Sequence, residues 1–251
     1  MNARQHELRV TCELRQVEDA VDIILHSLLL HRTSGKFVYR GNKDFTLGSI
    51  GIKEVNCEQI DMTYVRVNSN ELAMCLDENV RLFKSEVMDA SNSGSIPRIP
   101  PAVGSPTDSA VPLLSAQIGL EFYQKARRQS IAGSLGSWLG GNGEEHAVWE
   151  QWKLILDVFR VDSIDDLQKM KQTVADDIGE KVLDICEQIN QPLYTPKMPS
   201  KTELGDVYDT RFSDCQPYLF KIKRQAAPTI NSKPTSFVQM TTQRWKDILA
   251  I

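Results

Sequence analysis

The amino-acid sequence predicts a mixed α+β fold, and three observations support that class. Three long stretches repeat apolar residues at intervals of three and four, which is the period of an amphipathic helix. Several shorter stretches alternate apolar and polar residues, which is the period of a strand with one buried face. Along the chain these stretches occur in the order strand, helix, strands, helix, strands, long helix, strands.

The N-terminal part of the chain predicts a strand followed by a helix. Apolar residues alternate over residues 8–14, and from Gln16 they recur with helical spacing to about residue 30. Gly35 is placed to stop this helix, because glycine readily adopts the conformation that ends one. Three short strands are then expected, at residues 37–40, 45–52 and 61–67.

The rest of the chain predicts two further helices and the strands around them. Ser69 is a suitable N-cap for a helix that continues to Val87. Ser163 and Asp166 form a capping-box-like start for a long helix that ends near Asn190, before Pro192. Strands are expected at residues 117–124, 148–161, 218–224 and 236–240.

Two segments interrupt this pattern and are predicted to be loops. Residues 91–115 hold five of the eleven prolines, among many serines, which is typical of a disordered insertion. Residues 129–143 hold five of the fourteen glycines, which indicates a Gly-rich loop. Segments of the same fold flank both loops, so the 251 residues are expected to form one domain with two excursions.

Composition and charge exclude several classes of protein. The chain has 29 Lys and Arg residues against 33 Asp and Glu residues, a net charge of −4, which does not suit a general nucleic-acid binder. Its most apolar stretch, residues 21–30, contains Asp22 and His26 and is too short to cross a bilayer. The N-terminal residues lack the apolar run of a secretory signal. A cytoplasmic location is therefore expected.

The cysteines and histidines do not form a recognisable metal or disulfide pattern. The five cysteines, an odd number, include no CxxC pair, so reduced thiols are expected. His26 and His31 are five residues apart, which places them on different faces of a helix. We therefore expect no metal site and no cofactor. The residues concerned are Cys12, Cys57, Cys75, Cys186 and Cys215, with His6, His26, His31 and His146.

No set of residues predicts catalysis. Cys215 follows Asp214, whose negative charge disfavours the thiolate that a nucleophile needs. The paired aspartates of the long helix point apart and are expected to be solvated. A hydrolase that uses Cys215 or His31 stays as a remote alternative.

Trp138 and Leu139 are the unusual side chains of the Gly-rich loop. A large apolar residue among Gly and Ser either folds back onto the domain or is displayed for a partner or a membrane surface. Lys125, Arg127 and Arg128 precede the loop and would suit an acidic partner or anionic lipid, although a solvated strand end is the preferred interpretation of these charges.

Several segments of the sequence, taken together and in order, resemble the autophagy-related protein 101 family. The resemblance extends from about residue 15 to the C-terminal tail. The segments that carry it are Arg15-Gln16-Val17-Glu18, Leu29-Leu30-His31-Arg32, Gly35-Lys36-Phe37, Ile60-Asp61, Thr63-Tyr64-Val65-Arg66-Val67, Leu120-Glu121-Phe122-Tyr123-Gln124-Lys125, Gly179-Glu180-Lys181, Pro196-Lys197-Met198-Pro199 and Gln216-Pro217-Tyr218-Leu219.

This resemblance implies a HORMA domain: a mainly antiparallel sheet with three helices packed on it and a mobile C-terminal segment called the safety belt. It also implies a non-catalytic scaffold that pairs with the HORMA domain of autophagy-related protein 13 and stabilises it. Through that partner the chain would support the Unc-51-like kinase initiation complex, from the cytoplasm, at the phagophore assembly site. A HORMA protein of another pathway, which traps a peptide beneath its safety belt, stays open as an alternative.

The resemblance also implies two candidate contact sites. Family members display a finger loop with neighbouring Trp and Phe, which recruits downstream autophagy factors. Here Trp138 is followed by Leu139, and no Phe occurs between Phe122 and Phe159. By similarity to other HORMA pairs, the long helix is a candidate interface element, and its apolar side is formed by Leu167, Met170, Val174 and Ile178.

Overall fold

The computed structural model describes residues 3–92, 114–125, 146–161, 164–191 and 195–225. Its main sheet has four strands in the order β1-β8-β7-β10. Strand β1 runs parallel to β8, whereas β7 is antiparallel to both β8 and β10. The strands span β1 (Arg4–Glu13), β7 (Leu114–Lys125), β8 (His146–Phe159) and β10 (Phe220–Gln225).

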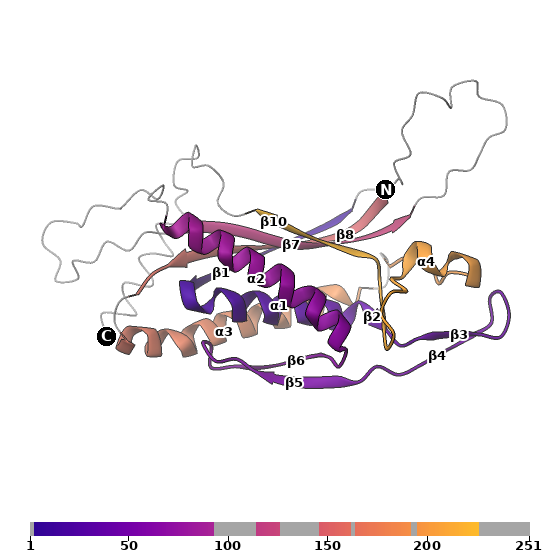
Figure 1. The fold of residues 1–251 in the computed structure, drawn as a ribbon, viewed down its shortest axis with the longest axis horizontal. Coiled ribbons are helices and arrows are strands. Elements are labelled where there is room, and N and C mark those ends of the chain that lie inside the picture. Colours follow the sequence, from indigo (N-terminus) through magenta and orange to yellow (C-terminus); the bar gives the residue numbers. More distant parts are fainter. Residues whose placement is uncertain (1–2, 93–113, 126–145, 162–163, 192–194, 226–251) are drawn as a thin grey trace, which may run out of the picture.

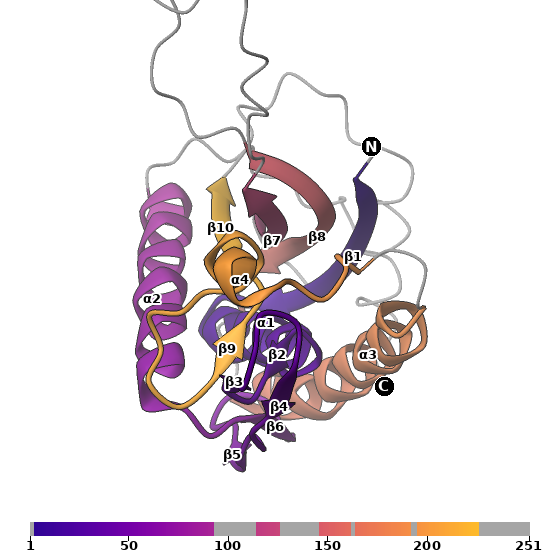
Figure 2. The ribbon, with the colours of Figure 1, turned by 90° about the vertical axis from the view of Figure 1, so that its right-hand side faces the viewer.

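Three long helices cover one face of this sheet (Figures 1 and 2). Helix α1 (Val17–His31) lies in the middle, between α2 (Asn70–Asn92) and α3 (Ile164–Ile189). This central position explains why most of α1 is buried, not just a single stripe along it. The buried residues of these helices and of the sheet form one apolar cluster.

Short two-stranded ribbons and turns complete the described structure. The ribbons pair β2 (Thr33–Ser34) with β9 (Gln216–Pro217), β3 (Phe37–Tyr39) with β4 (Phe45–Leu47), and β5 (Ile52–Asn56) with β6 (Thr63–Val67). The β5–β6 ribbon packs along α1 on the side away from the sheet, and the β3–β4 ribbon extends beyond the end of the helices (Figure 1). The remaining turns are the 3₁₀ helices η1 (Leu14–Gln16) and η2 (Lys201–Glu203) and the one-turn helix α4 (Leu204–Val207).

The predicted α+β class is confirmed, and the structure adds two details to the predicted architecture. The described residues contain a fourth α-helix besides the three long ones, because α4 adds a single turn before the last strands. The sheet is mixed, because β1 pairs in parallel with β8 across more than 130 residues of sequence. Local sequence patterns predict neither detail. A one-turn helix is too short to show periodicity, and the pairing of strands depends on contacts between distant parts of the chain.

The helix starts are better predicted than the end assigned to Gly35. Ser69 caps α2 as expected, since its Oγ accepts a hydrogen bond from the Leu72 amide at 3.2 Å. Helix α1, however, ends at His31, and Gly35 lies beyond β2. A Cβ at Gly35 would lie 2.0 Å from the carbonyl oxygen of Gly48. Gly35 therefore allows two backbone segments to approach closely and does not terminate the helix.

Two predicted segments have different boundaries in the structure. The strand expected at residues 45–52 is divided into β4 and the start of β5, with Gly48 and Gly51 between them. The insertion expected at residues 91–115 is shorter, because its first residues end α2 and Leu114 begins β7. Residues 93–113, the strand expected at 236–240 and the Ser163 cap lie outside the described residues.

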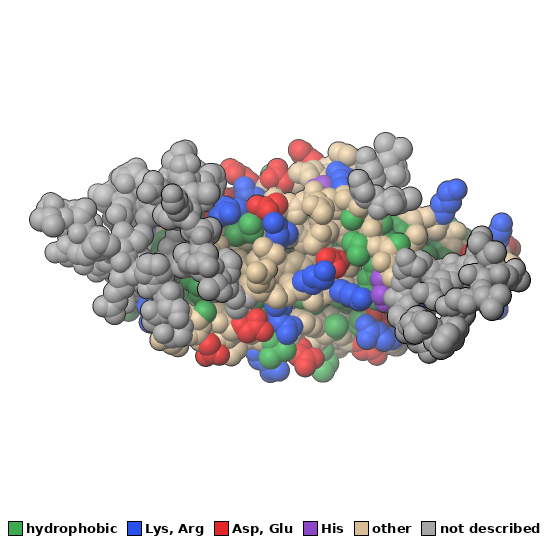
Figure 3. All heavy atoms as spheres, turned by 90° about the horizontal axis from the view of Figure 1, so that it is seen from above, with side chains coloured by type: hydrophobic (Ala, Val, Ile, Leu, Met, Phe, Trp, Pro, Cys, Tyr) green, Lys and Arg blue, Asp and Glu red, His purple; other side chains and the backbone are tan. Residues whose placement is uncertain are grey.

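The other face of the main sheet carries charged side chains of both signs (Figure 3). Lys153 of β8 pairs with Glu7 of β1, and Lys223 of β10 pairs with Glu121 of β7 at 2.7 Å. These cross-strand pairs keep that face polar while the helices cover the apolar one. No helix among the described residues is long and apolar enough to span a membrane.

Candidate functional site

A buried ion pair joins the end of α1, the main sheet and the end of α3. The guanidinium of Arg32 donates two hydrogen bonds to the carboxylate of Glu150, at 2.6 and 2.8 Å, and both side chains are almost fully buried. The same guanidinium donates to the carbonyl oxygen of Ile189 at 2.7 Å. A bidentate pair of this kind fixes the relative position of the three elements, because its geometry is directional.

A series of aromatic rings extends from this ion pair along the C-terminal segment. Trp149 lies beneath the Arg32 guanidinium and contacts the ring of Tyr218 at 5.2 Å. The Tyr218 ring stacks on that of Tyr208, with 4.4 Å between the ring centroids. The Tyr208 ring contacts that of Phe37 in β3, with 4.8 Å between the centroids. Residues 208–218 are therefore held between the sheet and the β3–β4 ribbon.

Hydrogen bonds fix the same segment to the N-terminal half of the chain. The Gln216 side chain accepts from the Phe37 amide at 2.8 Å, and the Tyr218 amide donates to the Arg32 carbonyl at 2.9 Å. Ser69, the cap of α2, donates to the Asp214 carboxylate at 2.7 Å. The C-terminal segment of the described residues is thus docked, with β10 along the edge of β7.

The predicted finger loop lies outside the described residues, but its base is well defined. Lys125 at the end of β7 is the register partner of His146 at the start of β8. The ring of Tyr123 contacts that of His146 at 4.6 Å, and the Lys221 ammonium lies over the Tyr123 ring at 4.8 Å. The segment that carries Trp138 and Leu139 therefore begins and ends at one end of the main sheet.

The four candidate interface residues of α3 are buried within the chain itself. Met170, Val174 and Ile178 belong to the common apolar cluster and are fully buried, and Leu167 is 9% exposed. On the outer side of α3 Leu183 is exposed at 65%, and Ile164, the first residue of the helix, is exposed at 78%. The apolar stripe thus positions the helix, whereas contact with a partner would use the outer side.

Among the described residues, no hydrogen bond joins Cys215 to His31. Instead His31 Nε2 lies 3.5 Å from the Cys186 thiol of α3. Cys215 is buried, and burial together with Asp214 raises the pKa of its thiol to about 11. A protonated, buried thiol is a poor nucleophile.

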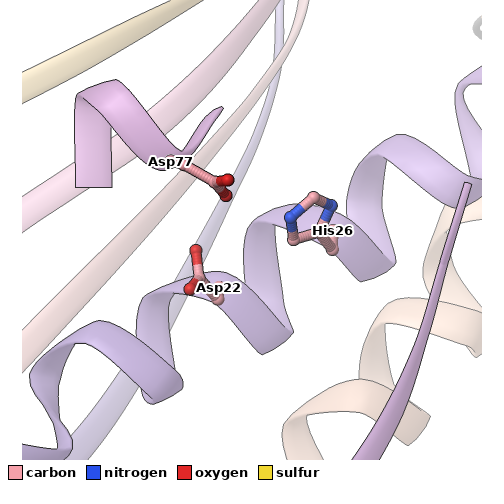
Figure 4. A group of neighbouring side chains, drawn as sticks. All are labelled: Asp22, His26 and Asp77. Carbon is pink, nitrogen blue, oxygen red and sulfur yellow. The ribbon is translucent and has the colours of Figure 1, made fainter. Parts of the chain in front are cut away.

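Three side chains with ligand atoms meet between α1 and α2: Asp22, His26 and Asp77 (Figure 4). One ligand atom from each lies within 4.8 Å of the other two. Burial, and then the nearby Asp77, raises the pKa of Asp22 to about 7. Burial, and then Arg66, lowers the pKa of His26 to about 3, which keeps its imidazole neutral.

This group was not predicted from the sequence, although part of its signal was visible. Asp22 and His26 are four residues apart in a helical stretch, and that spacing places both on one face. Histidine and cysteine spacing alone does not reveal the group, because two of its three members are aspartates. Asp77 lies 51 positions after His26, and only the packing of α2 on α1 brings it near.

Comparison with known proteins places the chain in a family. A family model described as Autophagy-related protein 101 matches residues 9–202. Proteins named Autophagy-related protein 101 from Xenopus tropicalis, Rattus norvegicus and Homo sapiens are each 33% identical to the chain over 251 residues, which is all of both chains.

These matches define the class as an autophagy protein that shares its whole length with vertebrate relatives. The chain belongs to the autophagy-related protein 101 family, and this membership gives it a role in autophagy. The family resemblance inferred from the sequence segments is therefore confirmed.

Proposed function

We propose that the chain is a non-catalytic scaffold of the autophagy initiation kinase complex. In this role it binds the HORMA domain of autophagy-related protein 13 and stabilises that domain. The observation that carries the proposal is the match to the autophagy-related protein 101 family over the whole chain. The Unc-51-like kinase is then an indirect partner, held through autophagy-related protein 13.

The proposed domain type is HORMA. Three long helices on one face of a sheet and a C-terminal segment that adds β10 to its edge support this proposal. In this view residues 195–225 include the first part of the safety belt, anchored by Arg32, Glu150 and Tyr218. The anchor favours a scaffold with a fixed shape over an adaptor that opens to trap a peptide.

The mechanism that we propose is burial of surface between two folded domains. A stable interface of standard size buries roughly 1,600 Å² in total. Binding stabilises the partner by mass action, since the complex withdraws folded molecules from the unfolding equilibrium. On this chain the outer side of α3 is the proposed contact, with Leu183 as its exposed apolar residue.

A second contact is proposed for the loop that follows β7. Trp138 and Leu139 would recruit downstream autophagy factors, in place of the Trp and Phe of the family pattern. The paired ends of β7 and β8 support this role, because they hold both ends of the loop at one edge of the molecule. Recruitment from the cytoplasm to the phagophore assembly site, with a peripheral membrane contact near Lys125, belongs to the same proposal.

Co-purification tests the pairing and the contact surface together. We expect the co-expressed chain to co-elute with a tagged HORMA domain of autophagy-related protein 13. Leu183→Asp should release it, because a charge would replace an apolar contact. Leu82→Asp is the matched control, since Leu82 is also exposed but lies on α2. Separate elution of the two wild-type proteins overturns the proposal, and retention by Leu183→Asp overturns the assignment to α3.

A further inference from the structure

The group formed by Asp22, His26 and Asp77 has the composition of a metal site. Two carboxylates and one imidazole supply three ligand atoms, and each residue type binds first-row divalent ions. Asp22 and His26 are one turn apart on α1, and Asp77 projects from α2 toward them (Figure 4). The ligands therefore come from two helices that pack against each other.

Two buried polar atoms of this group have no hydrogen-bond partner among the described residues. His26 is only 3% exposed, and its Nε2 has no hydrogen-bond partner among the described residues. The Oδ1 atom of Asp22 is also buried and without a partner there. Buried polar atoms without partners are costly, because they lose their hydrogen bonds to water on folding. A cation bound through these two atoms would satisfy both at once.

The charge around the group also favours a cation. No Lys or Arg of the described residues lies within salt-bridge distance of Asp22 or Asp77. Arg66 is the nearby cation that acts on both Asp22 and His26, and one positive charge only half compensates two carboxylates. Asp77 is exposed, so the group is open to solvent on one side and an ion has a path into it.

The spacing of the ligand atoms requires a small adjustment. An ion with tetrahedral coordination and metal–ligand bonds of about 2.0 Å holds its ligand atoms about 3.3 Å apart. The three atoms lie within 4.8 Å of one another, so side-chain rotations would bring them to that distance. Three protein ligands leave a position for water or for a group from a partner.

We propose that Asp22, His26 and Asp77 bind one divalent first-row transition-metal ion, such as Zn²⁺, which links α1 to α2. The imidazole ligand favours such an ion over Mg²⁺ or Ca²⁺, which prefer oxygen ligands alone. The ion would hold the N-terminal part of α2 against the central helix.

Titration of the metal-free full chain with Zn²⁺ tests the site. We expect one ion per chain to bind and to raise the melting temperature. Asp77→Asn should weaken binding at least about tenfold, since it removes the charge of one ligand. It should fold normally, because Asp77 is exposed. Glu78→Gln is the matched control, an exposed acid next to it that is not a ligand, and it should bind as the wild type does.

Co²⁺ provides a second measurement that locates the ion. Absorption typical of nitrogen and oxygen ligands, lost in Asp77→Asn, is the expected result. Absence of stoichiometric Zn²⁺ binding overturns the proposal, as does unchanged binding by Asp77→Asn. A thiolate-to-Co²⁺ charge-transfer band would also overturn it, because it would place the ion at a cysteine such as Cys186, beside His31.

Discussion

At the scale of single residues, Arg32 and Glu150 are the most consequential pair in the described structure. Glu150 is completely buried, and the guanidinium of Arg32 is the ion-pair partner that faces its carboxylate. Arg32 also binds the carbonyl of Ile189, which ties the C-terminal end of α3 to the same point. The pair is thus central to the docking of the C-terminal segment.

Removal of one member of this pair should be strongly destabilising. We expect Arg32→Met to lower the free energy of unfolding by about 3 to 5 kcal/mol, because Glu150 would keep a buried charge without a partner. The double variant that combines Arg32→Met with Glu150→Met should lose less free energy of unfolding than Arg32→Met alone. Lys153→Met, which removes the partly exposed pair with Glu7, should cost below about 1 kcal/mol. Equal losses for Arg32→Met and Lys153→Met in urea unfolding would contradict this account.

His6 predicts a dependence of stability on pH. Burial, and then Arg4, lowers the pKa of His6 below its usual value, and its ring stacks on Trp152 at 3.9 Å. The unfolded chain therefore binds more protons than the folded chain below about pH 6.5, and stability falls as the pH decreases through that range. His6→Phe keeps the stacking and removes the proton.

The measurement is urea unfolding at pH 7 and at pH 5. We expect His6→Phe to lose less stability than the wild type between these values. Some loss should persist, because burial also lowers the pKa of His31. An identical loss in both proteins would show that protonation of His6 is not linked to unfolding.

The residues of the candidate sites differ in how well their roles can be predicted from sequence. Helical spacing was sufficient to find the buried stripe of α3, since the pattern reports which side faces a core. It does not distinguish a core within the chain from an interface with a partner, and Met170 and Val174 lie in the core of the chain. The Asp22–His26 spacing was visible in the sequence, but Asp77 reaches them only through tertiary packing.

At the scale of elements, length decides what the sequence predicts. Helices α1, α2 and α3 and strands β7 and β8 contain enough residues for a clear period. The division of residues 45–56 into β4 and β5 and the single turn of α4 escape prediction, because three to five residues carry little periodicity. Parallel pairing of β1 with β8 depends on the assembled core.

Two glycines in these elements predict opposite effects of the same substitution. A Cβ at Gly119 of β7 would lie 2.4 Å from the backbone oxygen of Trp152, whereas a Cβ at Gly179 of α3 meets nothing within 4 Å. We expect Gly119→Ala to destabilise the protein by about 1 to 3 kcal/mol, because the strands would have to separate. Gly179→Ala should stabilise it by about 0.5 to 1 kcal/mol, as alanine favours the helix. Thermal unfolding that shows the same sign for both would contradict the packing of β7 on β8.

At the scale of the whole molecule, the two proposed contacts lie on different elements and should be separable. The finger loop joins β7 and β8 at one end of the sheet, whereas the outer side of α3 belongs to the helical layer (Figure 2). A scaffold with separate contacts can hold one partner and recruit another. Each function can therefore be removed alone.

Trp138→Ala is the substitution that should remove recruitment. We expect it to leave circular dichroism, melting temperature and pairing unchanged, and to reduce co-precipitation of downstream autophagy factors from cells. Leu139→Ala should add to the effect. A variant that unfolds would identify Trp138 as a core residue, and undiminished recruitment would exclude the finger loop as the binding element.

The central claim is that the chain binds and stabilises the HORMA domain of autophagy-related protein 13. Thermal unfolding of that domain, alone and mixed with equimolar chain, tests it most directly. The account predicts that the partner unfolds at a higher temperature in the mixture, by an amount that increases with concentration. Two independent transitions, each at the temperature of the isolated protein, would contradict the account.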